Sequence, residues 1–472
     1  MRNFQLVCSS PSYQVVSDHD QAVWSIRSLK YILLWLLLWQ DNMVPGSPIQ
    51  IIEHIGSPAP FNGFEVWLFL CLAVLAIERV MVGYYEMKRS YFWGPLLLMT
   101  FSLVLSYTRG AYMLQHFKPV VEAHEAIMLP VAYFIVLNLF REPGEWRVLP
   151  TILILACAAK ALDGSLIYFF SSSPIKNWGV LQEWRDGFLL AVGIVSVVLM
   201  LHYKGTALKW LRWTMIASLP LLLFALIVSY RRTFLLASLA GLLAMFLTLP
   251  RDRRMKHFWL LVTMVLGMFV FILLTDPIGF LTRLVGGVMN PKDEGSAYIR
   301  LMELPNILLN IYHNPILGVP VGTFWKQYYR MPLIAVYTLY GCHDTYLYWP
   351  LRTGIPGTFA FWWFLMRNWK TLLIQRRVAV YNEETQYFSQ LGIQVLVIYH
   401  VACFLGLLYA DGFIIMAVLM AWLQLMLEAE LGVKTLRDVK LFPTLKAGKL
   451  VFWDKRPSPQ TSSAVVQGGA QS

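Results

Sequence analysis

Long apolar runs alternate with short polar segments along most of the chain. The clearest runs cover 91–108, 187–203, 214–230, 233–250, 257–275, 388–410 and 412–427. Runs at 64–81, 127–140, 148–169 and 345–366 are short or interrupted by a charge, and 31–39 reaches span length only together with 40–45. Because a membrane-spanning helix needs about 20 mostly apolar residues, the pattern predicts an all-α, polytopic membrane bundle of about twelve spans.

The composition supports a membrane protein. Hydrophobic residues make up 57% of the chain and charged residues only 14%, whereas a soluble domain carries about 25% charged residues. The net charge of +12 could suggest a nucleic-acid partner, but the basic residues recur in short clusters between apolar runs. This distribution is typical of cytoplasmic loops and argues against nucleic acid as a partner.

The positions of Lys and Arg also predict the orientation. If both termini are cytoplasmic, every inner segment carries at least two basic residues, which satisfies the positive-inside rule. Only the side of the N-terminus depends on whether residues 31–45 cross the membrane. The expected organisation is a cytoplasmic leader (1–27), a first group of spans (28–275), a large outer loop (276–344), a last group of spans (345–427) and a basic cytoplasmic tail (428–472) with a disordered end.

The outer loop is much longer than the other connections. It contains a stretch, 296–312, with apolar residues at helical spacing. A loop of this length is usually functional or disordered, and its aromatic and apolar content argues against disorder. We therefore expect a helical extracytoplasmic cap between the ninth and tenth spans.

The charged residues that break the positive-inside bias gather around this loop: Arg231, Arg232, Arg300, His343, Asp344 and Arg352. An arginine near hydrocarbon costs a few kcal/mol, so it is normally paired or placed by function. Each arginine taken alone could simply extend to the outer headgroups. Several guanidinium groups at one outer mouth would instead form a receptor for phosphate oxygens.

Three pieces of sequence resemble the superfamily of O-antigen ligases and O-antigen or exopolysaccharide polymerases. The first is Ser229-Tyr230-Arg231-Arg232-Thr233 before a long apolar helix. The second is Arg300 followed by residues 313–324, His-Asn-Pro-Ile-Leu-Gly-Val-Pro-Val-Gly-Thr-Phe. The third is His343-Asp344-Thr345-Tyr346-Leu347 with Gly354-Ile355-Pro356-Gly357. The chain departs from the pattern at Asp344, where the family usually has Asn, and at Pro320-Val321, which lengthens the Gly-x-Gly.

The resemblance implies a multi-pass glycosyltransferase of the bacterial cytoplasmic membrane. Such enzymes transfer or polymerise a glycan from a polyprenyl-diphosphate carrier onto an acceptor sugar hydroxyl at the outer face, without a metal or other cofactor. Arginines would stabilise the diphosphate leaving group, and a histidine would deprotonate the acceptor. The resemblance thus assigns catalysis to His343 and Arg300, and diphosphate binding to Arg231, Arg232, Arg300 and Arg352.

Two further roles are expected around this site. Asp344 either orients His343 or caps the following helix, since Asp is common at helix N-termini. Tyr328, Tyr329, Tyr337 and Tyr340 are candidates for stacking on sugar rings. The Asp-x-Asp spacing at Asp18 and Asp20 lies in the polar leader, so we expect no metal site there.

Two other classes of function fit a polytopic chain: a transporter of an anion or a lipid-linked sugar, and a non-catalytic subunit of a polysaccharide export system. Transporters usually bind their substrates near the bilayer midplane, between broken helices. Here the only ionisable residues deep in the spans are Lys160, Asp163 and His400. The one-sided chemistry favours an enzyme, and leaves ligase and polymerase equally open.

Overall fold

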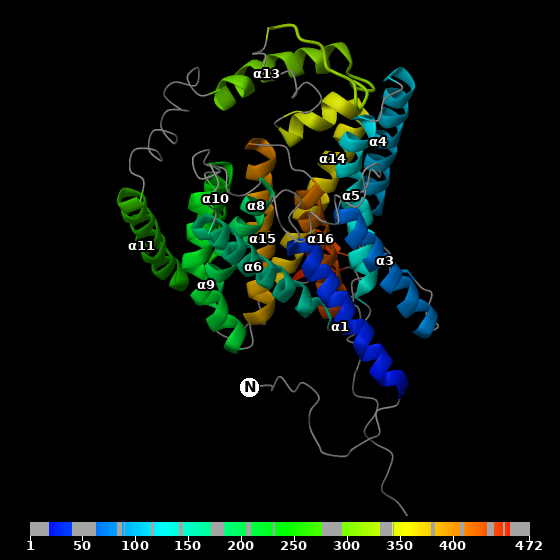
Figure 1. Cartoon of the computed structure of the whole chain (residues 1–472). Helices are drawn as coiled ribbons and strands as arrows, with labels where there is room; N and C mark the ends of the chain where they lie inside the picture. The colour runs from blue at the N-terminus through cyan, green and yellow to red at the C-terminus, as the bar shows by residue number, and fades with distance from the viewer. Residues whose placement is uncertain are drawn as a thin grey trace, which may run out of the picture.

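The structure is a computed structural model, and it is predominantly a helical bundle (Figure 1). It describes residues 18–39, 63–82, 87–88, 90–114, 118–140, 145–170, 184–203, 209–229, 232–275, 295–330, 342, 344–378, 383–405, 410–431, 439–446 and 449–453. The helices are α1 (Asp18–Trp39), α3 (Gly63–Val82), α4 (Trp93–Leu114), α5 (Lys118–Leu139), α6 (Val148–Phe170), α8 (Trp184–His202), α9 (Lys209–Val228), α10 (Arg232–Thr248), α11 (Arg251–Thr275), α13 (Gly295–His313), α14 (Thr345–Val378), α15 (Glu383–Leu405) and α16 (Ala410–Leu431), with a 3-10 turn at Glu145–Arg147.

Each apolar run predicted to span the membrane coincides with one of these helices. Three segments in the described part of the chain are long and apolar enough to cross a membrane by length and composition: Glu145–Leu166, Thr385–Leu405 and Gly412–Ala429. Five other apolar segments are shorter: Ser28–Trp39, Ile127–Leu139, Gly187–His202, Arg212–Ile227 and Thr233–Thr248. The helical class is confirmed, while the number of crossings stays a prediction.

The bundle carries its polar side chains inside and many apolar ones outside. Helix α16 is buried from Gly412 to Leu427, yet it holds the amide of Gln424 at 0% exposure. Helix α11, at the edge of the bundle (Figure 1), exposes Trp259 and Leu266 by 61% and 59%. Water would penalise such an apolar outer surface. A bilayer solvates it well, because lipid tails are as apolar as leucine.

The basic ends of several helices meet at the end of the bundle that lies away from α13. The buried Lys30 Nζ lies 3.4 Å from Glu78 Oε1 and 3.1 Å from Glu145 Oε1, and it donates to the Leu139 carbonyl at 2.8 Å. This cluster joins α1, α3, α5 and the turn before α6, all at positions predicted to be cytoplasmic. Helix α13 lies across the opposite end of the bundle (Figure 1). Which end faces the cytoplasm stays a prediction.

Helix α14 is broken at Gly354, which has φ 62° and ψ −153°. The break leaves backbone groups without helical partners, and the segment after α13 supplies them. Val319 N donates to Leu351 O at 2.6 Å, and Ile355 N donates to Pro315 O at 2.9 Å. The loop therefore docks into the break by backbone pairing, as buried peptide groups require.

Helix α4 supports the same loop from the side. Ser106 Oγ donates to Arg352 O and accepts from Val321 N at 3.1 Å, and Arg109 Nη1 donates to Leu317 O at 2.8 Å. A Cβ at Gly110 would collide with the Val321 carbonyl. This glycine thus lets the loop approach the α4 backbone directly.

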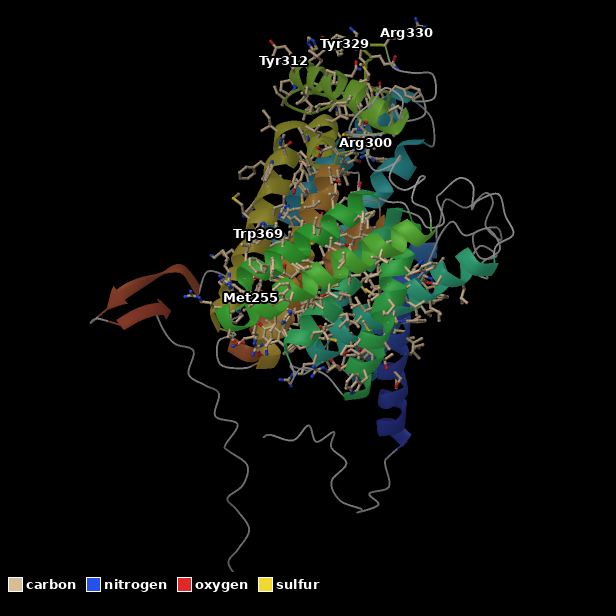
Figure 2. The ribbon with its side chains drawn as sticks, turned by 90° about the vertical axis from the view of Figure 1, so that its left-hand side faces the viewer. Met255, Arg300, Tyr312, Tyr329, Arg330 and Trp369 are labelled. Carbon is tan, nitrogen blue, oxygen red and sulfur yellow. The ribbon has the colours of Figure 1, made fainter. Side chains whose placement is uncertain are left out.

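The tail contains one element that the all-α prediction did not include. Strands β1 (Val439–Lys446) and β2 (Lys449–Trp453) form an antiparallel hairpin that projects from the bundle (Figure 2). Alternating β-branched, aromatic and polar residues, separated by Ala-Gly, explain the hairpin. The predicted disordered end, from Arg456 on, lies outside the described residues.

Gly318 provides a test of the loop docking. It has φ 66°, and an added Cβ would lie 2.7 Å from both Arg352 C and Leu351 O. Gly318→Ala should destabilise the protein by at least about 1–2 kcal/mol from the left-handed backbone alone, which a lower Tm in detergent would reveal. Gly267→Ala is the matched control, because nothing lies within 4 Å of its Cβ position. An equal Tm for both variants would contradict the docking.

Candidate functional site

Three helix ends converge beneath α13: the end of α15 and the starts of α10 and α14 (Figure 1). Helix ends carry unpaired backbone groups and partial charges, so polar side chains concentrate there. Several of the predicted site residues belong to these ends or to the segments beside them. The site can therefore be built from their contacts.

Arg300 lies on the side of α13 that faces the bundle. In Figure 2 it lies between the bundle and the outer edge that carries Tyr312, Tyr329 and Arg330. Its Nη1 donates to Leu405 O, the last residue of α15, at 2.9 Å. A cation at a helix C-terminus is favourable, because it meets unpaired carbonyls and the negative end of the dipole. This half-buried guanidinium thus fixes α13 over the end of α15.

Helix α10 runs antiparallel to α15. Gln394 Nε2 of α15 donates to Thr248 Oγ1 near the end of α10, at 3.1 Å, and a Cβ at Gly241 would touch Ile398 one to two turns further along. Extending this register at 1.5 Å per residue brings the backbone of Arg232, the first residue of α10, to the end of α15. The Arg232 backbone and Arg300 therefore lie at the same end. Arg231, predicted for the same role, lies outside the described residues.

Asp344 caps helix α14, which is one of its two predicted roles; the other, orientation of His343, stays a prediction. Its Oδ1 accepts from Tyr346 N at 2.7 Å and from Leu347 N at 3.2 Å, and its carbonyl accepts from Tyr348 N at 2.9 Å. Burial raises the pKa of this carboxyl, the two N–H donors oppose the shift, and Glu303 nearby adds to it. His343, the predicted base, lies outside the described residues, between Cys342 and Asp344 in the sequence.

A column of rings follows the cap between α14 and α15. The indole Nε1 of Trp369 donates to His400 Nε2 at 2.8 Å, and the hydroxyl of Tyr346 is hydrogen-bonded to His400 Nδ1. An indole can only donate, so His400 Nε2 carries a lone pair and the imidazole is neutral. The ring planes of Tyr346 and His400 differ by 4°. His400 is thus a hydrogen-bonded interior histidine.

Arg352 was predicted to bind diphosphate, and its contacts correct this assignment. The side chain is fully buried, and its Nη1 donates to Pro320 O and Thr323 O at 3.0 Å each. Its backbone carbonyl accepts from Ser106. The guanidinium holds the loop on α14, where a buried charge is tolerated because carbonyl oxygens surround it. Sequence spacing alone could not distinguish a buried anchor from an exposed receptor.

An asparagine ladder on α13, missed in the sequence, fixes the outer part of the loop. Asn306 Oδ1 accepts from Tyr328 N and Tyr329 N at 2.7 and 2.8 Å, and Asn310 pairs with both backbone groups of Lys326 at 2.9 and 2.7 Å. Each side-chain amide thus satisfies backbone groups of the loop that have no hydrogen-bond partner in a helix or strand. The signal was available, because Asn306, Asn310 and Asn314 recur every four residues on one helix face.

The ladder also orients two of the four tyrosines predicted to stack on sugars. Tyr329 is 54% exposed, so one face of its ring can accept a ligand. Tyr328 stacks on His313, with ring centroids 5.3 Å apart, and Lys326 Nζ lies 5.0 Å from its centroid. Tyr337 and Tyr340 lie outside the described residues. No group of three or more His, Cys, Asp or Glu in the described part of the chain is placed to hold a metal.

The cap at Asp344 makes a stability prediction with a defined sign. Asp344→Ala should cost about 0.5–2 kcal/mol through the lost cap, whereas Asp344→Asn keeps an acceptor oxygen. Because the folded pKa is raised above 3.8, the wild-type carboxyl contributes stability below about pH 3.8, and this contribution is lost as pH rises through the folded pKa. The Tm of Asp344→Asn should therefore increase relative to the Tm of the wild type as pH rises. A constant difference between the two curves would contradict this assignment.

The sequence comparisons agree with the resemblance seen in the three sequence pieces. Residues 217–362 match the model of a family described as O-antigen ligase. The match contains all three pieces and runs from α9 into α14, across the whole cap. No curated protein matches the chain significantly. The chain, a bacterial membrane protein with apolar helices, thus carries the domain of the O-antigen ligase superfamily at residues 217–362, which supports a ligase- or polymerase-type membrane glycosyltransferase.

Proposed function

We propose that the protein transfers or polymerises a glycan from a polyprenyl-diphosphate carrier onto an acceptor sugar hydroxyl at the outer face of the cytoplasmic membrane. The observation that supports this most is the position of Arg300, which the cap holds at the bundle end where α10 and α14 begin. Arg232 starts α10, and Asp344, next to His343 in the sequence, caps α14. Elements that carry all three pieces of the family domain thus end or begin at the same end of the bundle, which supports the proposal.

The arginines would receive the leaving group. A diphosphate leaves as a stable anion, so catalysis mainly requires donors aimed at the developing charge. A guanidinium has five N–H donors in a fixed fork, and Arg300 is held over the end of α15 by its bond to Leu405 O. We assign diphosphate binding to Arg231, Arg232 and Arg300. Arg352 is left out, because its buried side chain holds the loop.

His343 would act as the general base. An imidazole with an ordinary pKa near 6.5 is largely neutral at pH 7 and can take a proton from a hydroxyl. Asp344 would help indirectly, since its cap fixes the start of α14 one residue beyond His343. We propose no metal or other cofactor for this step. The reaction forms a glycosidic bond to the acceptor oxygen and breaks the bond between the sugar and the carrier diphosphate.

The two substrates would approach the site from different sides. The polyprenyl chain has to stay in the bilayer, because each buried CH₂ is worth about 0.8 kcal/mol, so the donor would enter from the lipid side. The acceptor glycan would lie along the cap, where Tyr329 offers an exposed ring beside the asparagine ladder. The partners are therefore a lipid-linked glycan donor, a glycan or lipid-linked sugar acceptor, and membrane lipid.

The base assignment can be tested with purified protein in detergent, supplied with a polyprenyl-diphosphate glycan. His343→Ala should lower the release of lipid diphosphate about 10²–10⁴-fold, the usual contribution of general base catalysis. Asp344→Asn, which keeps the cap, should retain most of the activity. If folded His343→Ala protein releases lipid diphosphate as fast as the wild type, the protein is a non-catalytic subunit. If the wild-type protein in vesicles moves the glycan across the membrane without releasing diphosphate, it is a transporter.

The arginine assignment has a matched control on the same cap. Arg300→Gln should lower kcat about 10²-fold, as the loss of a transition-state donor does. Arg330→Gln removes an exposed arginine at the outer edge (Figure 2) and should leave the rate unchanged. Equal losses in both variants would show that the general charge of the cap matters and would remove the specific role of Arg300.

A further inference from the structure

The opposite end of the same three helices contains a second polar site. Where α10 and α14 end and α15 begins, with the first turn of α11 beside them, a cleft of about 330 Å³ opens. This volume falls within the roughly 300–1,000 Å³ of small-molecule sites. Its polar lining comes mainly from Arg254, Arg376, Ser389 and Gln390. In the predicted orientation this end faces the cytoplasm.

Two arginines form the rim of the cleft. Arg254 donates through Nε to Leu249 O at 2.8 Å and through Nη2 to Leu247 O at 3.2 Å, and Arg376 Nη2 approaches Thr248 O at 3.4 Å. The end of α10 thus holds both guanidinium groups in place. Both side chains are exposed, and among the described residues neither is paired with a carboxylate. Each guanidinium retains further N–H donors, because only Nε and Nη2 of Arg254 and Nη2 of Arg376 are engaged.

The floor of the cleft contains a buried hydroxyl that needs a partner. Ser389 is 1% exposed and lines the cleft, and its Oγ has no hydrogen-bond partner among the described residues. A buried unsatisfied polar atom is costly, so its persistence needs an explanation. Capping of α10 by the two arginines does not explain the unsatisfied hydroxyl, because Ser389 takes no part in the cap. A ligand that accepts hydrogen bonds from Ser389 and from both arginines would explain it.

The charge around the cleft specifies an anion. Among the residues whose side chains the structure describes, the lining contains two arginines and no Asp or Glu. Arg251 and Lys256 on the same first turns of α11 add positive charge, while Asp252 lies 3.8 Å from Arg253 Nε and does not line the cleft. Two guanidinium forks and a hydroxyl match the tetrahedral acceptor set of a phosphate group.

We propose that Arg254, Arg376 and Ser389 form a binding site for a phosphate group, at the end of the bundle opposite the glycosyl-transfer site. The phosphate can belong to an anionic phospholipid of the adjacent leaflet or to a soluble phosphate compound. The site is separate from the proposed chemistry, since it lies at the far ends of α10, α14 and α15. A bound phosphate would hold together the ends of α10, α11, α14 and α15 at the cleft. Three of these helices, α10, α14 and α15, also extend to the proposed glycosyl-transfer site at the other end of the bundle.

The test uses the purified full-length protein and two probes. Inorganic phosphate is titrated in neutral detergent at constant ionic strength. Phosphatidylglycerol is offered in phosphatidylcholine nanodiscs, and the bound lipid is counted by native mass spectrometry. Arg254→Gln/Arg376→Gln should weaken binding of the preferred probe at least about tenfold, as expected for lost charge-assisted hydrogen bonds. Arg251→Gln/Lys256→Gln removes the same charge outside the cleft and should weaken binding much less, because it removes no direct hydrogen-bond donor to the phosphate.

Ser389→Ala separates a ligand site from a capping arrangement. Removing the unsatisfied hydroxyl should leave the Tm of the ligand-free protein equal or higher, while it weakens binding of the probe. Tighter binding of phosphatidylglycerol would assign the site to a lipid headgroup, and tighter binding of inorganic phosphate to a soluble compound. The proposal is overturned if neither probe binds saturably, if the two double variants bind equally, or if Ser389→Ala binds like wild type.

Discussion

The backbone pairing between the broken helix α14 and the loop after α13 is the interaction on which the rest of the structure depends. A helix interrupted at Gly354 exposes an N–H and a carbonyl that a membrane bundle cannot leave unpaired. Val319 and Pro315 supply the missing partners. The loop is therefore held by groups that cannot be satisfied elsewhere, and α13, attached directly before it, is fixed across the bundle end.

This constraint explains why so many polar residues near the loop are structural. Ser106, Arg109 and Arg352 all bond to backbone groups of the loop or of the break. Asn306 and Asn310 do the same from α13. In the described part of the cap, these side-chain-to-backbone bonds give the loop after α13 a defined shape. A cap fixed in this way can hold Arg300 at a constant place over α15, as its proposed role as a preorganised donor requires.

Helices α10, α14 and α15 build both ends of the bundle. At one end they meet Arg300, and at the other they frame the cleft rimmed by Arg254 and Arg376. In both places an arginine sits on carbonyls at a helix C-terminus, the position where the helix dipole favours a cation. The same local physics thus produces two cationic regions with different surroundings, one covered by the cap and one open.

Most of the fold was predictable from the sequence. Apolar runs of span length dictated the helices, because the bilayer allows little else, and the alternation of basic segments dictated which helix ends lie together. The helix within the large loop and the cap at Asp344 were also readable, since both depend on local spacing and on one side chain near one helix start. The hairpin at Val439–Trp453 was missed, as a short strand pair in a polar tail gives a weak signal.

The contacts of individual arginines were decided by the tertiary structure alone. Arg300 and Arg352 look alike in sequence, yet one faces the end of α15 and the other is buried against loop carbonyls. Hydrophobic periodicity predicts that a residue is helical and on which face of the helix it lies. It does not predict which distant segment, such as the loop after α13, packs against that face. The sequence by itself therefore determined the helices and the family of the domain. Only the folded chain decided which backbone carbonyls each arginine contacts, because those carbonyls come from distant parts of the chain.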